Sequence, residues 1–315
     1  MIYYFENKDI VKKKWDDCIR HSVNERIYAY SWYLNIVAPD WSALILDDYQ
    51  AVFPIVHKKK WSVTYAFQPH FTQQLGLFTP LLITPELVES FLSKLFELFP
   101  FVQINLNAHN NLPSSFHFSF SKSNYELDLI SPYESLRNSY SKNTKRNIKK
   151  AHKAGLNIFK NLKPELVSEM FKKDRGSRLK VYSESDYLTL NQLIYKAISR
   201  GKAEVWGAYS KYNTLIASAV FIKDSKRFTF LFSGNSKEGK ENGAMFFLID
   251  SFIETHAENK MILDFEGSMD QNLARFYKSF GSQLVKYPHV YRNKLPFYIN
   301  ILLFFKNKVR KLNPF

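Results

Sequence analysis

The sequence predicts an α/β protein, with a mixed sheet of the α+β type, that is built from two similar units. Short apolar runs typical of buried strands alternate with longer segments in which apolar residues recur at helical spacing. An order of hairpin, helix and strand occurs once in each half, beginning near residues 41–56 and 205–220. With 315 residues, the chain is long enough for two domains that each bury a core. We therefore expect two tandem units with a cleft between them.

Residues 1–130 are expected to form the first unit. The loop over 68–76 joins a predicted strand to a helix and is dense in amides and aromatic rings. Gln68, Gln73 and Gln74 are therefore candidates to bind an acceptor substrate, with ordinary loop polarity as the alternative. The predicted elements are helices over 8–20, 32–37 and 84–99 and strands over 41–46, 51–57, 61–67, 101–106 and 125–129.

The second unit, residues 131–296, is expected to open with a helix that carries a stripe of positive charge. Ser131 and Glu134 have the spacing of a capping box, and Gly155 predicts the end of the helix. One alternative is that the stripe is a solvated surface; the other is that it contacts phosphate groups, with Lys145 and Arg146 as substrate-binding candidates. The cations of the stripe are Lys142, Lys145, Arg146, Lys149, Lys150 and Lys153.

A candidate ligand site lies after two strands in the rest of this unit. Small and polar residues follow the strands predicted at 227–233 and 261–265, at positions 233–243 and 264–268. In α/β sheets, ligands bind at the carboxyl ends of strands and at helix N-termini. The other predicted elements are strands over 156–162, 203–209 and 215–223, helices over 165–173, 186–200, 243–257 and 272–281, and a final strand.

The order of elements in the second half resembles the GNAT acyltransferase fold. Residues 272–281 (NLARFYKSFG) are similar to the late motif of that family. Two such units in tandem resemble the Fem-type aminoacyltransferases, which add amino acids to peptidoglycan precursors, and their standalone GNAT relatives. The resemblance covers nearly the whole chain, and it also rests on the helix over 139–155 and the short motifs at 233–235, 243–244 and 264–268.

The resemblance implies an acyltransferase with acyl-CoA, such as acetyl-CoA, as co-substrate and an amine as acceptor, on a small molecule or a cell-envelope precursor. Tyr277 stands where Fem-type enzymes usually have lysine, which favours a thioester donor. Residues 237–243 keep glycines of the GNAT pyrophosphate loop without its spacing, which favours an aminoacyl-tRNA-dependent transferase or a non-catalytic ligand-binding relative. All three functions stay open.

Acyl transfer to an amine needs a base, a donor to the acyl oxygen and an acid for the leaving group. Tyr277 is the candidate acid, with core packing as the alternative. Asp264 and Glu266 follow the end of a strand, and we expect one of them to face a cleft and act as the base, with capping of the next helix N-terminus as the alternative. The residues expected to hold the donor are Ser233, Gly234, Asn235, Gly243, Ala244 and Asn272.

Composition limits the partners. The net charge of +15 suits an anionic small-molecule or nucleotide-linked substrate, tRNA or an anionic membrane surface, although a solvated lysine-rich surface would explain it too. Cys18 is the single cysteine, which excludes an intrachain disulfide, and no metal-ligand spacing occurs, so we expect no metal.

No signal peptide is recognisable and no apolar run is long enough to span a membrane, so we expect a cytoplasmic protein. Residues 297–315 are predicted to form a basic amphipathic helix that docks on the first unit or lies peripherally on the inner face of the membrane.

Overall fold

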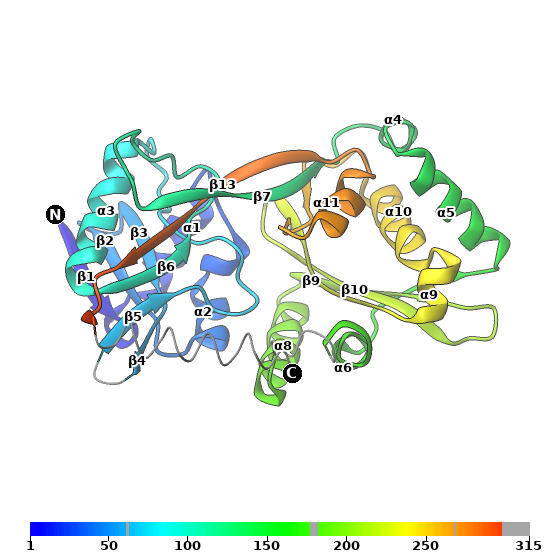
Figure 1. Cartoon of the computed structure of the whole chain (residues 1–315), viewed down its shortest axis with the longest axis horizontal. Coiled ribbons are helices and arrows are strands. Elements are labelled where there is room, and N and C mark those ends of the chain that lie inside the picture. The colour runs from blue at the N-terminus through cyan, green and yellow to red at the C-terminus, as the bar shows by residue number, and fades with distance from the viewer. Residues whose placement is uncertain (61–62, 177–181, 268, 298–315) are drawn as a thin grey trace. The chain divides into compact units, whose positions relative to one another are not determined.

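The computed structural model describes residues 1–60, 63–176, 182–267 and 269–297 (Figure 1). Among these described residues, unit 1 contains 1–24, 38–121 and 287–297, and unit 2 contains 25–37 and 122–286. These ranges differ from the expected division at residue 130. The chain passes between units within the strands β7 (Ser119–Asp128) and β13 (Gln283–Asn293). Residues 25–37 belong to unit 2 because their polar side chains bind there; the Glu25 carboxylate, for example, accepts a hydrogen bond from the Ser225 hydroxyl.

Unit 1 has two groups of strands. The strands β1, β2 and β3 form an antiparallel sheet, and β4, β5, β6 and β13 follow one another in the larger sheet. The helix α3 buries Val88, Phe91, Leu92 and Leu95, which form its apolar stripe. The elements of this unit are β1 (Ile2–Glu6), α1 (Lys12–His21), β2 (Ser42–Leu46), β3 (Ala51–Ile55), β4 (His57–Lys60), β5 (Val63–Phe67), α3 (Pro85–Leu98) and β6 (Phe101–Asn105), with the 3-10 turn η1 (Asn7–Asp9).

Unit 2 carries helices on both faces of the strands β7-β12-β11-β10-β9-β8 (Figure 1). The helix α10 covers β9 and β10 on one face, with α5 packed against it, and α6 covers β10 and β11 on the other. The elements of this unit are η2 (Ile27–Ala29), α2 (Ser31–Val37), α4 (Tyr133–Asn138), α5 (Lys142–Lys153), β8 (Asn157–Lys160), α6 (Pro164–Phe171), the π-helical η3 (Lys172–Gly176), α8 (Glu184–Ser199), β9 (Ala203–Tyr209), β10 (Leu215–Lys223), β11 (Arg227–Asn235), α9 (Lys237–Asn242), α10 (Ala244–His256), β12 (Ile262–Asp264) and α11 (Gln271–Lys278).

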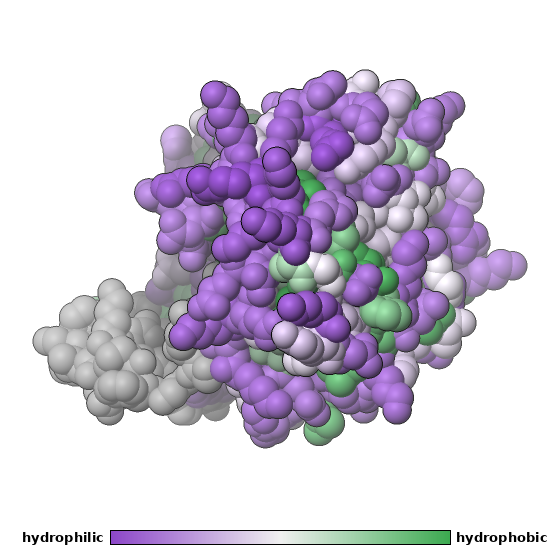
Figure 2. Space-filling view, turned by 90° about the vertical axis from the view of Figure 1, so that its right-hand side faces the viewer, coloured by the Kyte–Doolittle hydropathy of each residue, from purple (hydrophilic) through white to green (hydrophobic). Residues whose placement is uncertain are grey.

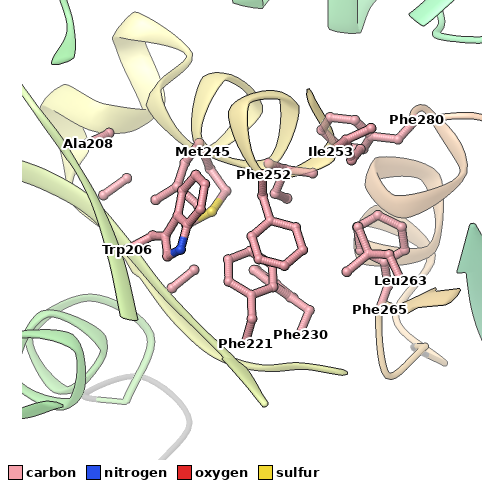
Figure 3. Packing of buried hydrophobic residues seen from close by; sticks show 14 of the residues in the cluster. Trp206, Ala208, Phe221, Phe230, Met245, Phe252, Ile253, Leu263, Phe265 and Phe280 are labelled. Atoms are coloured by element: carbon pink, nitrogen blue, oxygen red, sulfur yellow. The ribbon is translucent and has the colours of Figure 1, made fainter. Parts of the chain in front are cut away.

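Aromatic rings fill the core between α10 and the sheet (Figure 3). Phe221 of β10 stacks on Phe252 of α10 with ring centroids 3.6 Å apart, and Trp206 of β9 meets Phe252 edge-on at 5.2 Å. Each buried aromatic side chain removes a large apolar area from water, so this layer holds α10 firmly against the strands. The start of α10 is thereby fixed with respect to the sheet.

The two units repeat one arrangement. In unit 1 the parallel strands β5 and β6 are connected through α3, and in unit 2 the parallel strands β11 and β12 are connected through α10. A strand hairpin precedes each pair, β2–β3 and β9–β10. The prediction of two similar α/β units is confirmed.

The helix predicted from residue 131 to 155 is two helices, and the predicted capping box is wrong. No side chain caps α4, whose N-cap position is Pro132. The Ser141 hydroxyl instead accepts a hydrogen bond from the Thr144 N–H and starts α5. The sequence analysis also missed β1 and α9; α9 starts where the Ser236 hydroxyl accepts from the Gly239 N–H.

Residues 298–315 lie outside the described part of the chain, and with them nearly all of the predicted C-terminal helix. Among the residues that the structure describes, no helix is long and apolar enough to cross a membrane.

Candidate functional site

The parallel strands of unit 2 separate at their carboxyl ends. β12 pairs with β11 only from Arg227 to Thr229, whereas β11 continues to Asn235. β11 also has a bulge against β10, because Phe230 and Phe232 face consecutive residues of β10 and Leu231 has no opposite partner. A bulge turns the following side chains to the other face of a strand. The separation and the bulge together create two cavities.

The larger cavity, which we call the α10 cavity, has a volume of about 510 Å³. Such a volume is typical of small-molecule sites. The described residues that line it are Asp174, Phe230, Ser233, Asn235, Gly239, Lys240, Gly243, Met245, Phe246, Asp270, Asn272, Leu273, Phe276 and Tyr277. The structure thus brings together five residues that the sequence analysis selected from separate segments: Ser233, Asn235, Gly243, Asn272 and Tyr277.

The N-terminus of α10 lies in the wall of this cavity. Gly243 ends α9 and precedes α10 with a φ of 73°, in the left-handed region that favours glycine. No side chain caps α10, so the N–H groups of its first turn have no side-chain acceptor. By contrast, the Asp270 carboxylate caps α11 by accepting from the Asn272 and Leu273 N–H groups. A phosphate would therefore meet free helix N–H groups at α10 and a carboxylate at α11.

Two of the predicted donor residues do not line the α10 cavity. Ala244 is fully buried in the core. Gly234 lies against α6, where a Cβ atom would come within 2.7 Å of the Met170 side chain. Asn235 does line the cavity, and its Oδ1 atom is buried without a hydrogen-bond partner.

The smaller cavity, which we call the aromatic chamber, has a volume of about 270 Å³. Phe230, Ser233, Leu273 and Tyr277 line both cavities. The described residues of the chamber are Phe171, Tyr182, Phe230, Leu231, Phe232, Ser233, Phe265, Glu266, Gly267, Leu273 and Tyr277.

The two candidate bases occupy different places. Asp264 is 1% exposed; its carboxylate pairs with Arg227 at 3.9 Å and accepts from Asn124 at 3.0 Å, so it belongs to the interior and cannot meet a substrate. Burial and the nearby Glu126 carboxylate raise the pKa of Asp264. Glu266 lines the aromatic chamber and accepts a hydrogen bond from the buried Tyr28 hydroxyl. Only Glu266 is placed to act on a ligand.

The charge state of Glu266 follows from its surroundings. Burial raises the pKa of Glu266 to about 8, while the hydrogen bond from Tyr28 favours the ionised form and limits the rise. A carboxyl group with such a pKa can take up and release a proton near neutral pH. Glu266 therefore has the acid–base property that proton transfer requires.

Tyr277 packs in the core and also reaches both cavities. Its ring stacks on Phe265 at a centroid distance of 5.1 Å, and the residue is 8% exposed. Core packing, one of the two alternatives from the sequence, therefore describes this residue, and its role as an acid stays a prediction.

The glutamines of unit 1 hold a loop together. Gln68 accepts from the Asn105 N–H at 2.9 Å, and the fully buried Gln74 accepts from the Ala108 N–H at 3.0 Å. Gln74 also donates to Gln73 at 2.7 Å. Leu75 extends the parallel pairing of this unit by a bridge to Leu106. These contacts give Gln68 and Gln74 a structural role in the loop.

The positive stripe is exposed, as both explanations require. Lys145 donates to the Asn138 carbonyl at 3.0 Å and Arg146 donates to Asn143 at 2.8 Å. Figure 2 shows that the side of unit 2 on which α5 lies is predominantly hydrophilic. The helix also packs closely against Gly243, because a Cβ atom on Gly243 would meet the Asn147 carbonyl at 2.6 Å.

Sequence reasoning missed Tyr28 and the rings of Phe171, Tyr182 and Phe232. Tyr28 is 238 residues from Glu266, so no local pattern connects them. The aromatic residues look like ordinary core positions in the sequence. The bulge at Leu231, which turns Phe232 toward the chamber, has no signal in the sequence either.

Comparison with known proteins identifies the fold. No protein-family model and no curated protein matches the chain by sequence. Among solved structures, FemX has a TM-score of 0.61 at 12% identity over 89% of this chain and 96% of its own. L-PGS from Bacillus licheniformis has a TM-score of 0.55 at 11% identity, covering 92% of this chain and 95% of that one. A tandem GNAT protein from the clavulanic acid biosynthesis pathway has a TM-score of 0.55 at 11% identity, covering 94% and 99%.

The chain therefore has the tandem GNAT fold, of the kind also seen in FemX. At these identities the likeness concerns the fold, and the function has to be argued from the site.

Proposed function

We propose that the protein transfers an acyl group from an acyl-CoA-type thioester to an amine of a small molecule or a cell-envelope precursor. The observation that carries the proposal is the uncapped start of α10 in the wall of a cavity, at the point where β11 and β12 separate. Helix N–H groups at such a start attract phosphate. The N–H groups after Gly243 would hold the pyrophosphate of the donor.

The residues around the α10 cavity fit such a donor. The exposed cations of α5 lie on a helix that touches Gly243 and add positive potential for phosphates. Asn235 supplies a buried amide oxygen with no partner, which can accept from an amide N–H of the donor's arm. Phe230, Leu273 and Phe276 give the apolar walls that a thioester requires.

The transfer uses Tyr277, which lines both cavities, and Glu266, which lines the aromatic chamber. The acceptor amine lies in the aromatic chamber and gives a proton to the Glu266 carboxylate. Its nitrogen attacks the thioester carbonyl, so a C–N bond forms and the C–S bond breaks. The Tyr277 hydroxyl donates a proton to the departing thiolate, and the second amine proton passes to solvent. Proton exchange with solvent then restores the Tyr277 hydroxyl and the Glu266 carboxylate. Products are an amide and a free thiol, and no further reactant is needed.

A second candidate is transfer from an aminoacyl-tRNA. It is favoured by the exposed cations of α5, since clustered lysines bind nucleic-acid phosphates. The thioester donor is preferred because the α10 cavity encloses a small-molecule volume and is walled in part by apolar residues.

A binding experiment separates these candidates. Acetyl-CoA, a longer acyl-CoA and deacylated tRNA are titrated separately, and the melting temperature is recorded. We expect acyl-CoA to raise it and tRNA to leave it unchanged. Leu273→Trp, which narrows both cavities, should abolish the rise, whereas Leu188→Trp at a 64% exposed position of α8 should retain it. A rise with tRNA alone would select the second candidate.

A further inference from the structure

The larger sheet of unit 1 has one face that packs in the core and one face that does not. Its strands β4, β5, β6 and β13 are neighbours (Figure 1). Ala66, Val102 and Val290, one from each of the last three strands, belong to the same buried cluster as the apolar stripe of α3. Side chains alternate between the two faces of a strand. The residues next to these three in the sequence therefore point away from α3.

Aromatic rings line this second face. Tyr65 of β5 lies opposite Phe101 of β6 with ring centroids 6.2 Å apart, and Tyr291 of β13 meets Phe101 edge-on at 5.7 Å. Lys58 of β4 lies opposite Tyr65, and its Nζ atom is 5.2 Å from the centre of the Phe67 ring. Tyr291 is 43% exposed, so its ring reaches the surface. We call these five residues the aromatic face.

The strands that form this face contain cations and no acidic residue. β4 consists of a histidine and three exposed lysines, and the residues at 61–62 that precede β5 are tryptophan and serine. The sequences of β5, β6 and β13 contain neither aspartate nor glutamate. Residues 294–315, which follow β13, contain five cations and no acid. These segments together favour an anionic partner.

The side chains of β4 are directed to the aromatic face in part. Lys58 and Lys60 lie opposite Tyr65 and Val63, and directly opposite residues of an antiparallel pair share a face. Aromatic side chains favour the boundary between lipid headgroups and hydrocarbon. Lysines beside them are attracted to the phosphates of anionic lipids. A row of rings bordered by lysines therefore has the chemistry of a membrane-binding surface.

The described part of the chain ends beside this face. The Lys294 N–H donates to the carbonyl of Pro100, the residue before β6, at 2.8 Å, and Phe297 is 79% exposed. Seven of the eight residues at 298–305 are apolar or aromatic, and the four cations at 306–311 come after them. Nucleic acid would attract the cations alone, whereas an anionic bilayer also takes up apolar side chains. The shared positive charge disfavours docking of residues 298–315 on the face itself.

From these observations we propose that the aromatic face and β4 bind the surface of an anionic lipid bilayer. Tyr291 enters the headgroup region, and Lys58 and Lys60 pair with lipid phosphates. The proposal concerns unit 1 and uses no residue of the α10 cavity or the aromatic chamber, so it does not depend on the proposed acyl transfer.

The charged part of the proposal is tested by flotation of the full chain with vesicles. We expect binding to an equal mixture of phosphatidylcholine and phosphatidylglycerol and none to phosphatidylcholine alone. Lys58→Gln combined with Lys60→Gln should weaken the binding roughly 30-fold. The matched control is Lys13→Gln combined with Lys14→Gln, which removes two exposed lysines of α1 and should change the binding by less than about threefold, because salt screens distant charges.

The aromatic part is tested with the same vesicles. Tyr291→Ser should weaken binding several-fold, because a ring is lost from the headgroup region. Tyr212→Ser, at a 76% exposed position between β9 and β10, should leave it unchanged. Melting temperatures of all variants check that they are folded.

Three results would overturn the proposal. The first is equal binding to both kinds of vesicle. The second is that the variants of β4 and Tyr291 bind like their controls, which would assign any lipid binding to the segment after residue 297. The third is retention of polyuridylate, or formation of a dimer, in place of vesicle binding and sensitive to Tyr291→Ser, which would assign the face to nucleic acid or to a second copy of the chain.

Discussion

Tyr28→Phe tests how the protein controls the ionisation of Glu266. The substitution removes a buried hydroxyl that donates to the Glu266 carboxylate and leaves the ring in place. This hydrogen bond favours the ionised form, so its loss must raise the pKa of Glu266 above its value of about 8. A hydrogen bond to a charged group contributes about 1.5–3 kcal/mol, and one pKa unit corresponds to about 1.4 kcal/mol. We therefore expect a rise of about one to two units.

The assay is a carboxyl ¹³C NMR titration of protein labelled at glutamate. Glu266→Gln identifies the Glu266 signal by its absence. A matched control is Tyr195→Phe, which removes a hydroxyl that donates to Glu165 at 2.8 Å on the surface of unit 2. This control should leave the Glu266 titration unchanged. An unchanged or lowered Glu266 pKa in Tyr28→Phe would show that Tyr28 does not stabilise the ionised form, and the reasoning from the hydrogen bond would be refuted.

Three other predictions concern stability and are measured by urea unfolding. The folded-state pKa of Glu266 is raised from 4.5 to about 8, so the stability that the protonated side chain contributes is complete below pH 4.5 and is lost as the pH rises to 8. Relative to Glu266→Gln, the free energy of unfolding of the wild type should fall by at most about 5 kcal/mol across this range. Parallel pH profiles of the two proteins would contradict this. Arg227→Met removes the buried cation that pairs with Glu126 at 2.8 Å and with Asp264 at 3.9 Å, and it should cost about 3–5 kcal/mol of unfolding free energy. A cost below about 1 kcal/mol would mean that these ion pairs are dispensable. Gly243→Ala and Gly201→Ala both place alanine at a positive φ, which costs about 1–2 kcal/mol, but of these two glycines only Gly243 is crowded by the α5 backbone. Gly243→Ala should therefore be the more destabilising. Equal losses of unfolding free energy would show that α5 can shift away from the added methyl group at no cost.

Local patterns in the sequence were sufficient to predict most of unit 2. The helix expected over 243–257 is α10, from Ala244 to His256, because its apolar residues recur at helical spacing and pack on the sheet. The position of the candidate site was also predictable, since strand ends and helix starts are marked by small and polar residues. Ser233, Asn235 and Gly243 therefore line one cavity, as their place after a strand suggested.

The helix over 131–155 shows where local reasoning failed. Ser131 and Glu134 have the spacing of a cap, yet Ser141 is the residue whose hydroxyl binds a helix N–H. The Thr144 hydroxyl of the same turn donates to the Ser279 carbonyl at 3.0 Å, a contact across 135 residues. A tertiary contact of this kind selects one capping residue among several that the sequence allows.

The sequence by itself determined the fold class, the repeated order of elements and the neighbourhood of the site, because these depend on periodicity and on short-range backbone preferences. Only the tertiary structure decided which carboxylate lines a cavity. Asp264 and Glu266 are two residues apart and chemically alike, but Arg227 binds the first in the interior and Tyr28, from the far N-terminal part of the chain, binds the second at the chamber. The charge state of a carboxylate depends on burial and on such distant partners, and a linear pattern of residues contains neither.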